Sequence, residues 1–289
     1  MTVQGIGLHT GKPAEVSFCP APPNTGVYFV RRDLEGCPAV PVQAENVRAT
    51  ALATTLGNDD FAVSTVEHCL SSLTALHIDN LYIELKGPEI PVCDGSALPF
   101  FEVLSKVGVV EQEEPRVYLY VQKPIYVGNK DKHGYVVPYN GLRVSCTIDF
   151  PHPAIGHQVM DIDVNESTFS KQVASARTFG FLKDIEAMHA KGLALGGSLD
   201  NAIGLDDKGV MNEDGLRFED EFVRHKVLDA IGDLMTLGHP IMGHVVLFKA
   251  GHDLMNQLVC KILESTDSYK MVDLGGEMPP APPFKHPFT

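Results

Sequence analysis

The stretch Phe222–Asp233, which reads F-V-R-H-K-V-L-D-A-I-G-D, has the spacing of an amphipathic helix with a polar face. His225, Asp229 and Asp233 stand at i, i+4 and i+8, so a helix places all three on one side. The apolar residues gather on the other side: Val227, Leu228, Ile231 and Leu234. One imidazole and one carboxylate a turn apart can bind Zn²⁺, and the next carboxylate can orient a ligand. Taken alone, the pattern favours a helix with a solvated acidic face, so residues elsewhere must decide.

Composition narrows the classes of protein that the chain can be. The 289 residues are 44% apolar, which is enough for one large domain or two ordinary ones. Residues 1–5 lack the features of a signal peptide, and no run of about 18 apolar residues is present, so we expect a cytoplasmic protein without a transmembrane segment. The six cysteines form no C-x-x-C pair, which is typical of reduced thiols. The net charge of −14 argues against nucleic acid as a partner.

Apolar periodicity and turn residues predict a mixed α+β chain. The first half is expected to form a glycine-rich hairpin around His9, then a helix that opens at Ala62–His68, a strand at Leu81–Leu85 and a helix at Ala97–Val107. Glu111–Pro115 is the best candidate for a linker, so we expect domains at residues 1–114 and 115–289. The second half is expected to contain these elements: strands Val117–Val121, Ile125–Val127, Tyr135–Pro138, Leu142–Phe150 and His244–Phe248, and helices Ser167–Ala176, Ile185–Lys191, Phe222–Leu237 and one ending near Leu263.

The two halves share an order of elements, although their sequence identity is negligible. His68 begins a helix, a strand follows, and Gly95-Ser96 opens a second helix 27 residues after His68. In the second half His225 takes the first place, and Gly251-His252 opens the closing helix, again 27 residues on. Two such units would bring their first helices face to face, with His68 and His225 meeting at a seam. Sites for small ligands often form between domains.

A metal ion and a base can be assembled at that seam. His68, His225 and Asp229 would supply three ligands and leave one position open, which is the pattern of a catalytic zinc site. Glu67, next to His68, would take a proton from water as general base. Ser64 and Glu67 also have the spacing of a capping box, a purely structural role for this glutamate.

Three further residues complete a plausible set for hydrolysis. His252 at a helix start could protonate a leaving amine, and Asp233 could orient it. Thr178 offers a hydroxyl to an oxyanion. Jointly these residues indicate metal-assisted hydrolysis of an amide or ester. His9 is expected to be solvated at the hairpin tip, where a weak glycine-rich signal for phosphate binding also lies.

Several stretches, in this order, resemble those of the UDP-3-O-acyl-N-acetylglucosamine deacetylase family: Thr65–His68, Ala176–Phe179, Gly196–Ser198, Leu216–Lys226 with Asp229 and Gly232-Asp233, and Gly251-His252. The resemblance covers nearly the whole chain, from residues 5–11 to the final helix. It implies an enzyme of Gram-negative bacteria that removes acetate from the sugar 2-amino group, the committed step of lipid A synthesis. The start of the chain, only eight residues before His9, and the proline-rich tail Glu277–Thr289 do not follow the family pattern.

The resemblance also implies roles for individual residues. One catalytic Zn²⁺, or Fe²⁺ in its place, would be held by His68, His225 and Asp229. The catalytic roles would be distributed as follows: Glu67 as base, His252 backed by Asp233 as acid or electrostatic partner, and Thr178 at the oxyanion. The residues implied to contact the UDP-sugar are His9, Phe179, Lys226, Lys132 and Asp184.

The implied fold is α+β, with two similar domains. Each has a mostly antiparallel sheet packed on two helices, and the helices lie between the two sheets. An insert near Phe181–Gly204 would line an apolar passage for the acyl chain. We expect a monomer. Two alternatives stay open: another metal-dependent amidohydrolase, and a non-catalytic nucleotide-sugar-binding protein in which His225 and Asp229 are only structural.

Overall fold

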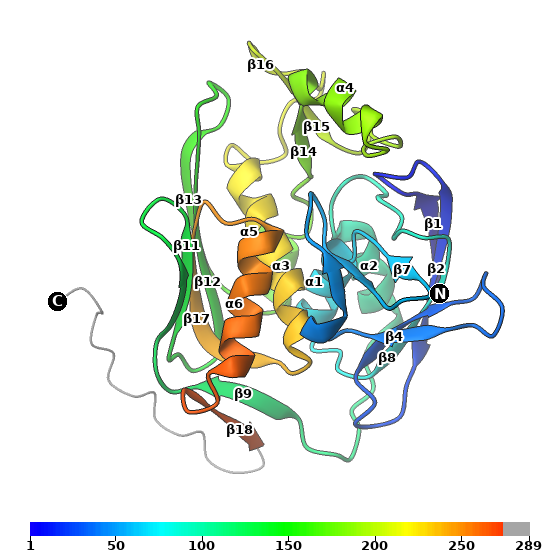
Figure 1. Ribbon diagram of the computed structural model, residues 1–289, viewed down its shortest axis with the longest axis vertical. Helices are drawn as coiled ribbons and strands as arrows, with labels where there is room; N and C mark the ends of the chain where they lie inside the picture. Colours follow the sequence, from blue (N-terminus) through cyan, green and yellow to red (C-terminus); the bar gives the residue numbers. More distant parts are fainter. Residues whose placement is uncertain (274–289) are drawn as a thin grey trace.

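The computed structural model describes residues 1–273, which form two main sheets with helices between them (Figure 1). The sheet of the N-terminal half has the order β1-β2-β8-β3-β4, and only β3 and β8 run parallel. Its strands are β1 (Thr2–Ile6), β2 (Pro13–Pro20), β3 (Val27–Arg31), β4 (Ala39–Pro41) and β8 (Leu81–Lys86). A separate small sheet beside it contains β5 (Val47–Ala49), β6 (Thr55–Gly57) and β7 (Ala62–Val63).

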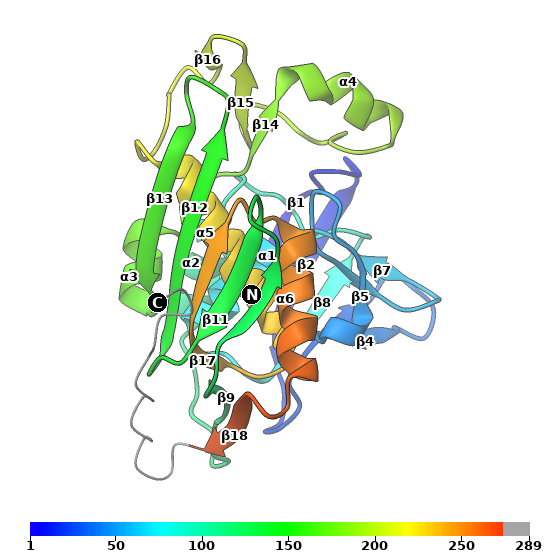
Figure 2. The same cartoon turned by 60° about the vertical axis from the view of Figure 1, so that its left-hand side comes forward.

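The sheet of the C-terminal half has the order β10-β11-β17-β12-β13, with β9 and β18 continuing it from one end of β17. Strands β12 and β9 run parallel to β17, and the other pairs are antiparallel. The strands are β9 (Val117–Val121), β10 (Ile125–Gly128), β11 (His133–Val137), β12 (Leu142–Phe150), β13 (Gly156–Asp163), β17 (Ile241–Phe248) and β18 (Tyr269–Asp273). Figure 2 shows this sheet from its outer side.

Four helices fill the space between the two sheets. They are α1 (Glu67–Ala75), α2 (Leu98–Val107), α5 (Glu221–Leu234) and α6 (His252–Glu264). A shorter helix, α3 (Glu166–Gln172), follows β13. This arrangement confirms the predicted α+β fold with helices between two mostly antiparallel sheets. Residues 108–116 lack regular secondary structure between α2 and β9, and the domain boundary after residue 114 stays a prediction.

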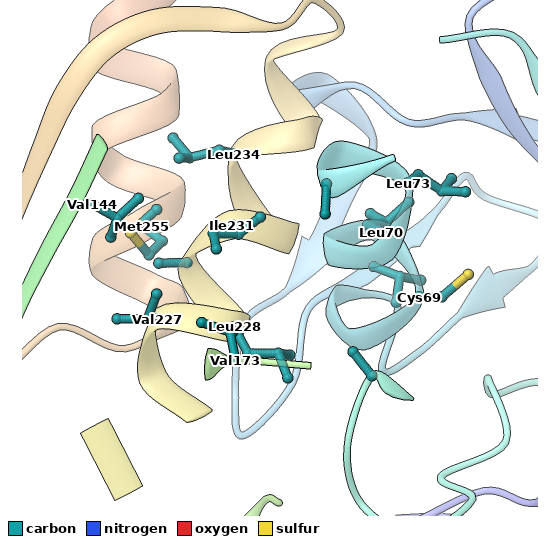
Figure 3. Close-up of a cluster of buried hydrophobic side chains, with 14 of the residues drawn as sticks. Cys69, Leu70, Leu73, Val144, Val173, Val227, Leu228, Ile231, Leu234 and Met255 are labelled. Carbon is teal, nitrogen blue, oxygen red and sulfur yellow. The ribbon is translucent and has the colours of Figure 1, made fainter. Parts of the chain in front are cut away.

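Helices α1 and α5 meet at the centre of the molecule. Apolar side chains from both helices, together with β12 and α6, form the core around them (Figure 3). Leu70 and Ile231 are fully buried in this cluster. Gly232 permits the close approach, because a Cβ atom there would collide with the carbonyl oxygen of Glu67. The sequence therefore brings the start of α1 against the last turn of α5.

The predicted insert forms a subdomain at one end of the molecule in both views (Figures 1 and 2). The subdomain extends a few residues beyond the predicted Phe181–Gly204 and consists of β14 (Phe179–Phe181), α4 (Leu182–Ala190), β15 (Ile203–Asp206) and β16 (Gly209–Val210). Its loop contacts the turn between β1 and β2, since the Leu195 amide donates to the His9 carbonyl and the Gly196 amide to the Leu8 carbonyl. The insert thus bridges to the N-terminal half.

Several local predictions were wrong. The first helix begins at Glu67, because Ala62-Val63 is strand β7. The proposed capping box does not form: Val66 is the N-cap, and the Ser64 hydroxyl instead lies 2.9 Å from the Thr55 hydroxyl. Strands β13 and β18 had not been predicted. The tail Glu277–Thr289 lies outside the described residues.

Candidate active site

Three predicted metal ligands meet between α1 and α5. The ligand atoms of His68, His225 and Asp229 all lie within 4.8 Å of one another. Asp229 Oδ1 is 3.3 Å from His225 Nε2 and 3.7 Å from His68 Nε2. A tetrahedral zinc site with bonds of about 2.0–2.1 Å has edges of roughly 3.4 Å. The observed spacing therefore suits such an ion, and the two imidazoles meet at the seam as expected, with ring centroids 4.9 Å apart.

The two oxygens of Asp229 have different surroundings. Oδ2 accepts a hydrogen bond of 2.7 Å from the Lys226 Nζ, whereas Oδ1 is buried and has no hydrogen-bond partner. Buried carboxylate oxygens without a partner are rare in proteins. Burial alone would raise the pKa of Asp229, but the nearby His225 and Lys226 lower it overall. An anionic oxygen thus faces two imidazole nitrogens, an arrangement that a cation would complete.

A neighbouring carbonyl orients the His225 ring, and burial lowers the pKa of both histidines. His225 Nδ1 lies 3.0 Å from the Ala176 carbonyl oxygen, which leaves Nε2 free to face the site. Burial lowers the pKa of His225, and burial followed by the proximity of His225 lowers the pKa of His68 to about 3. Both imidazoles are therefore neutral at neutral pH, as metal ligands must be.

A predicted base and acid adjoin the ligands. Glu67 Oε1 lies 3.8 Å from His252 Nε2, and the His252 Nδ1 lies 2.8 Å from Asp233 Oδ2. Burial raises the pKa of Glu67 to about 8. Burial would lower the pKa of His252, but Asp233 and Glu67 raise it to about 9. Glu67 and His252, with Asp229, also form a second group whose spacing could hold a metal ion.

One residue of this cluster was missed by the sequence analysis. Thr54 is buried, donates a 2.6 Å hydrogen bond from its hydroxyl to Asp233 Oδ1, and donates its amide to Glu67 Oε2 at 3.0 Å. A threonine in a loop has no distinctive spacing, and Asp233 is 179 residues away. No signal in a single sequence could have found this contact.

Thr178 and Phe179 follow Ala176, whose carbonyl oxygen contacts His225. The amide of Arg177, between Ala176 and Thr178, donates to Glu221 Oε1 at 2.9 Å, which fixes this segment next to α5. The Phe179 ring meets the His225 ring edge-on at 6.4 Å, and the Lys226 Nζ lies 5.6 Å from the centre of the Phe179 ring.

His9 is not solvated, which corrects the expectation of an exposed hairpin tip. The residue is 6% exposed. Its backbone amide donates to Glu89 Oε1 at 2.8 Å, and Nε2 of its ring is buried without a hydrogen-bond partner. The insert covers it, because the amide of Ala194 lies 3.4 Å from His9 Nδ1.

Lys132 and Asp184 lie on the surface. Lys132 occupies the turn between β10 and β11, and Asp184 the first turn of α4. Within residues 1–273 neither side chain has a hydrogen bond or ion pair with the buried cluster. Their roles stay predictions.

Comparisons with known proteins agree with this geometry. A family model described as UDP-3-O-acyl N-acetylglycosamine deacetylase matches residues 1–264. Three relatives named UDP-3-O-acyl-N-acetylglucosamine deacetylase are similar over most of their length. The protein of Bdellovibrio bacteriovorus is 59% identical over 96% of this chain and 91% of its own. Those of Syntrophotalea carbinolica and Myxococcus xanthus are 48% and 47% identical, over 95% and 94% of this chain and 89% and 86% of theirs. On this evidence the chain belongs to the UDP-3-O-acyl N-acetylglycosamine deacetylase family.

Proposed function

We propose that the protein hydrolyses the N-acetyl group of UDP-3-O-acyl-N-acetylglucosamine and releases acetate, the committed step of lipid A biosynthesis. The family match supports the substrate and the reaction. The observation that supports the chemistry is the buried Oδ1 of Asp229, which has no hydrogen-bond partner and faces His68 and His225. These three residues would hold a Zn²⁺ ion, and Fe²⁺ suits the same ligand types.

A divalent ion bound here would supply Lewis-acid chemistry, which polarises a carbonyl oxygen and makes water more acidic. The contribution of the chain is to keep three ligand atoms in place. Ala176 holds the His225 ring through its carbonyl, and Lys226 holds Asp229 through Oδ2. Such contacts behind the ligands commonly set metal affinity.

Glu67 is the proposed general base. Its Oε2 accepts the Thr54 amide, which leaves Oε1 to take a proton from the attacking water. His252 would give a proton to the leaving amine while Asp233 holds its ring and its positive charge. The Thr178 hydroxyl would stabilise the negative charge that develops on the carbonyl oxygen.

The substrate would extend from this centre in two directions. The acyl chain suits the insert, where α4 has no fully buried residue and Leu182 and Leu195 are 52% and 53% exposed. The UDP-sugar would contact these residues: His9, Phe179, Lys226, Lys132 and Asp184. We further propose that the protein is a cytoplasmic monomer with the domains 1–114 and 115–289. Among the described residues no helix has the length and apolar character to cross a membrane.

Metal analysis and an acetate assay on the purified protein test this function together. We expect about one zinc per chain and acetate release from the UDP-acyl-sugar. A chelator should abolish the release, and added zinc should restore it. Activity that persists after complete removal of metal would contradict the mechanism.

The same experiment distinguishes the two alternatives. Bound zinc without acetate release on this substrate would indicate another amidohydrolase with the same ligands. Absence of both zinc and release would leave a nucleotide-sugar-binding protein. In that case UDP should still bind, which calorimetry would measure.

A further inference from the structure

Thr54 uses all of its polar groups inside the candidate active site. It lies one residue before β6, and 3% of it is exposed. Its carbonyl accepts the Val66 amide at 3.3 Å, at the residue that caps α1. Its own amide donates to Glu67 Oε2 at 3.0 Å. Both backbone groups therefore hold Thr54 against the start of α1.

The hydroxyl of Thr54 reaches across to the C-terminal half. It donates to Asp233 Oδ1 at 2.6 Å, while the other oxygen of Asp233 is 2.8 Å from His252 Nδ1. The hydroxyl itself lies 3.4 Å from the same His252 nitrogen. A carboxylate bonded through both oxygens cannot rotate freely, so the direction of the His252 ring depends on the Thr54 hydroxyl as well as on Asp233.

The position of Thr54 connects the two groups that must exchange protons with the substrate. Glu67 Oε1 and His252 Nε2 are 3.8 Å apart, although Glu67 is on α1 and His252 begins α6. Thr54 contacts the side chain of Glu67 directly and reaches His252 through Asp233. In proteins, such contacts behind a reacting group commonly change activity about 10–100-fold when removed.

We propose that Thr54 is a positioning residue for the deacetylation: its amide fixes the base Glu67 while its hydroxyl fixes Asp233 and thereby the acid His252. This inference rests on the proposed function, because it assigns no reaction of its own. It predicts that the hydroxyl matters for turnover and not for binding of the metal.

Substitution of Thr54 by valine removes the hydroxyl but keeps the size, the β-branch and the amide. We expect Thr54→Val to lower kcat about 10–100-fold, with the KM and the zinc content within about twofold of the wild type. Thr54→Ser keeps the hydroxyl, so its kcat should stay within about threefold of the wild type. If the valine variant unfolds, Thr54→Ala tests the same loss without the added methyl group.

Thr55 provides a matched control. It is the next residue, also a threonine, and its hydroxyl bonds to Ser64 at 2.9 Å instead of to the cluster. Thr55→Val should leave kcat within about twofold of the wild type. A loss of kcat as large as that of Thr54→Val would show that any hydroxyl near the start of β6 matters, and the inference would fail.

A double-mutant cycle with His252→Ala separates positioning from a general structural effect. If Thr54 acts through Asp233 and His252, Thr54→Val should cost less than about threefold in kcat once His252 is absent. Independent, multiplying losses would overturn the inference. A fully active Thr54→Val would overturn it too, while leaving the proposed function intact. Zinc-loaded wild-type protein that releases no acetate would instead overturn the proposed function, and this inference with it.

Discussion

The two helices that meet at the active site hold their polar residues in different ways. On α5, His225, Asp229 and Asp233 occupy the fifth, ninth and thirteenth positions of a 14-residue helix, about one turn apart. On α1, Glu67 and His68 occupy the first two positions of a nine-residue helix. The backbone just before them is unusual, since Thr65 has a φ of 58°. Helical geometry alone aligns the first set, whereas the second depends on what fixes the start of α1.

Contacts from loops fix that start. The Thr65 hydroxyl donates to Glu89 Oε1 at 2.8 Å, and the same carboxylate accepts the amides of His9 and Thr10. Thr54 binds Glu67 from another loop. A regular helix therefore carries two of the three proposed metal ligands, while the proposed base stands where an irregular segment enters α1. We therefore expect losses of metal from changes on α5, and losses of turnover with metal retained from changes at Glu67.

Substitution of His225 by alanine should have the largest effect. The change removes one of three ligands and leaves Asp229 Oδ1 with a single imidazole, so we expect zinc to fall from about one per chain to below about a tenth, with no measurable acetate release. Metal analysis after dialysis measures this directly. Full zinc occupancy in His225→Ala would refute the ligand assignment and the division of labour between the helices.

Substitution of Glu67 by glutamine tests the expectation for α1, which is a loss of turnover with zinc retained. Loss of a general base costs about 10²–10⁴ in kcat, and Glu67 is absent from the proposed ligand set, so zinc should stay at about one per chain. Steady-state acetate release and metal analysis on one preparation provide both numbers. If zinc is lost together with turnover, Glu67 belongs to the metal site. Changes on α1 would then remove metal just as changes on α5 do.

The difference between the regular helix α5 and the loop-fixed start of α1 also explains which parts of the site the sequence could predict. The repeat of four residues on α5 indicated the polar face directly, and the shared order of elements in the two halves placed Glu67 and His68 opposite His225. Ser64 and Glu67 have the spacing of a capping box, but both side chains bond to more distant residues instead. The Ser64 hydroxyl bonds to Thr55, and the Glu67 carboxylate accepts the Thr54 amide.

Burial of His9 was unpredictable for a similar reason. The residues that cover it, Ala194 to Gly196, are about 185 positions away. Strand β13 (Gly156–Asp163), in contrast, has a local pattern that predicts it. Met160 and Ile162 alternate in the sequence with Asp161 and Asp163. The two apolar side chains are buried and the two acidic ones exposed, as in a half-buried strand. Periodic elements can be predicted from one sequence, whereas contacts between distant loops cannot.

Gly232 tests the seam where the two helices meet. A Cβ atom in Gly232→Ala would collide with the Glu67 carbonyl, so α1 and α5 would have to separate. Overpacking of this kind costs about 1–3 kcal/mol of unfolding free energy, and a shift of about 1 Å in a catalytic geometry can cost roughly 10²-fold in rate. Denaturant unfolding and kcat at saturating zinc measure both.

Gly209→Ala is the control for that variant, because a Cβ atom at Gly209 would meet no atom within 4 Å. It should leave kcat unchanged and unfolding free energy within about 0.5 kcal/mol of the wild type. Normal stability and turnover in Gly232→Ala would mean that the helices tolerate a wider separation, and the close crossing would not be what holds the site together.

The smallest effect is expected at Glu221, where α5 itself depends on a loop. Its buried carboxylate accepts bonds from the amide, Nε and Nη2 of Arg177 and from the amide of Arg217. Burial would raise the pKa of Glu221, but these hydrogen bonds, led by that of the Arg177 side chain, hold it below 4.5. A glutamine would turn an NH₂ group toward N–H donors, so Glu221→Gln should lose about 1–3 kcal/mol of unfolding free energy at neutral pH.

The pH dependence identifies the cause of that loss. Because the folded pKa of Glu221 lies below its unfolded value, the carboxylate stabilises the fold above about pH 4.5, and this contribution disappears as the pH falls through the folded pKa. The difference in unfolding free energy between wild type and Glu221→Gln should therefore shrink from about pH 6 to about pH 4. Glu219→Gln, at an exposed position two residues earlier, should show no such trend. A difference that stays constant with pH would mean that packing, and not the charge of Glu221, ties the segment from Ala176 to Thr178 to α5.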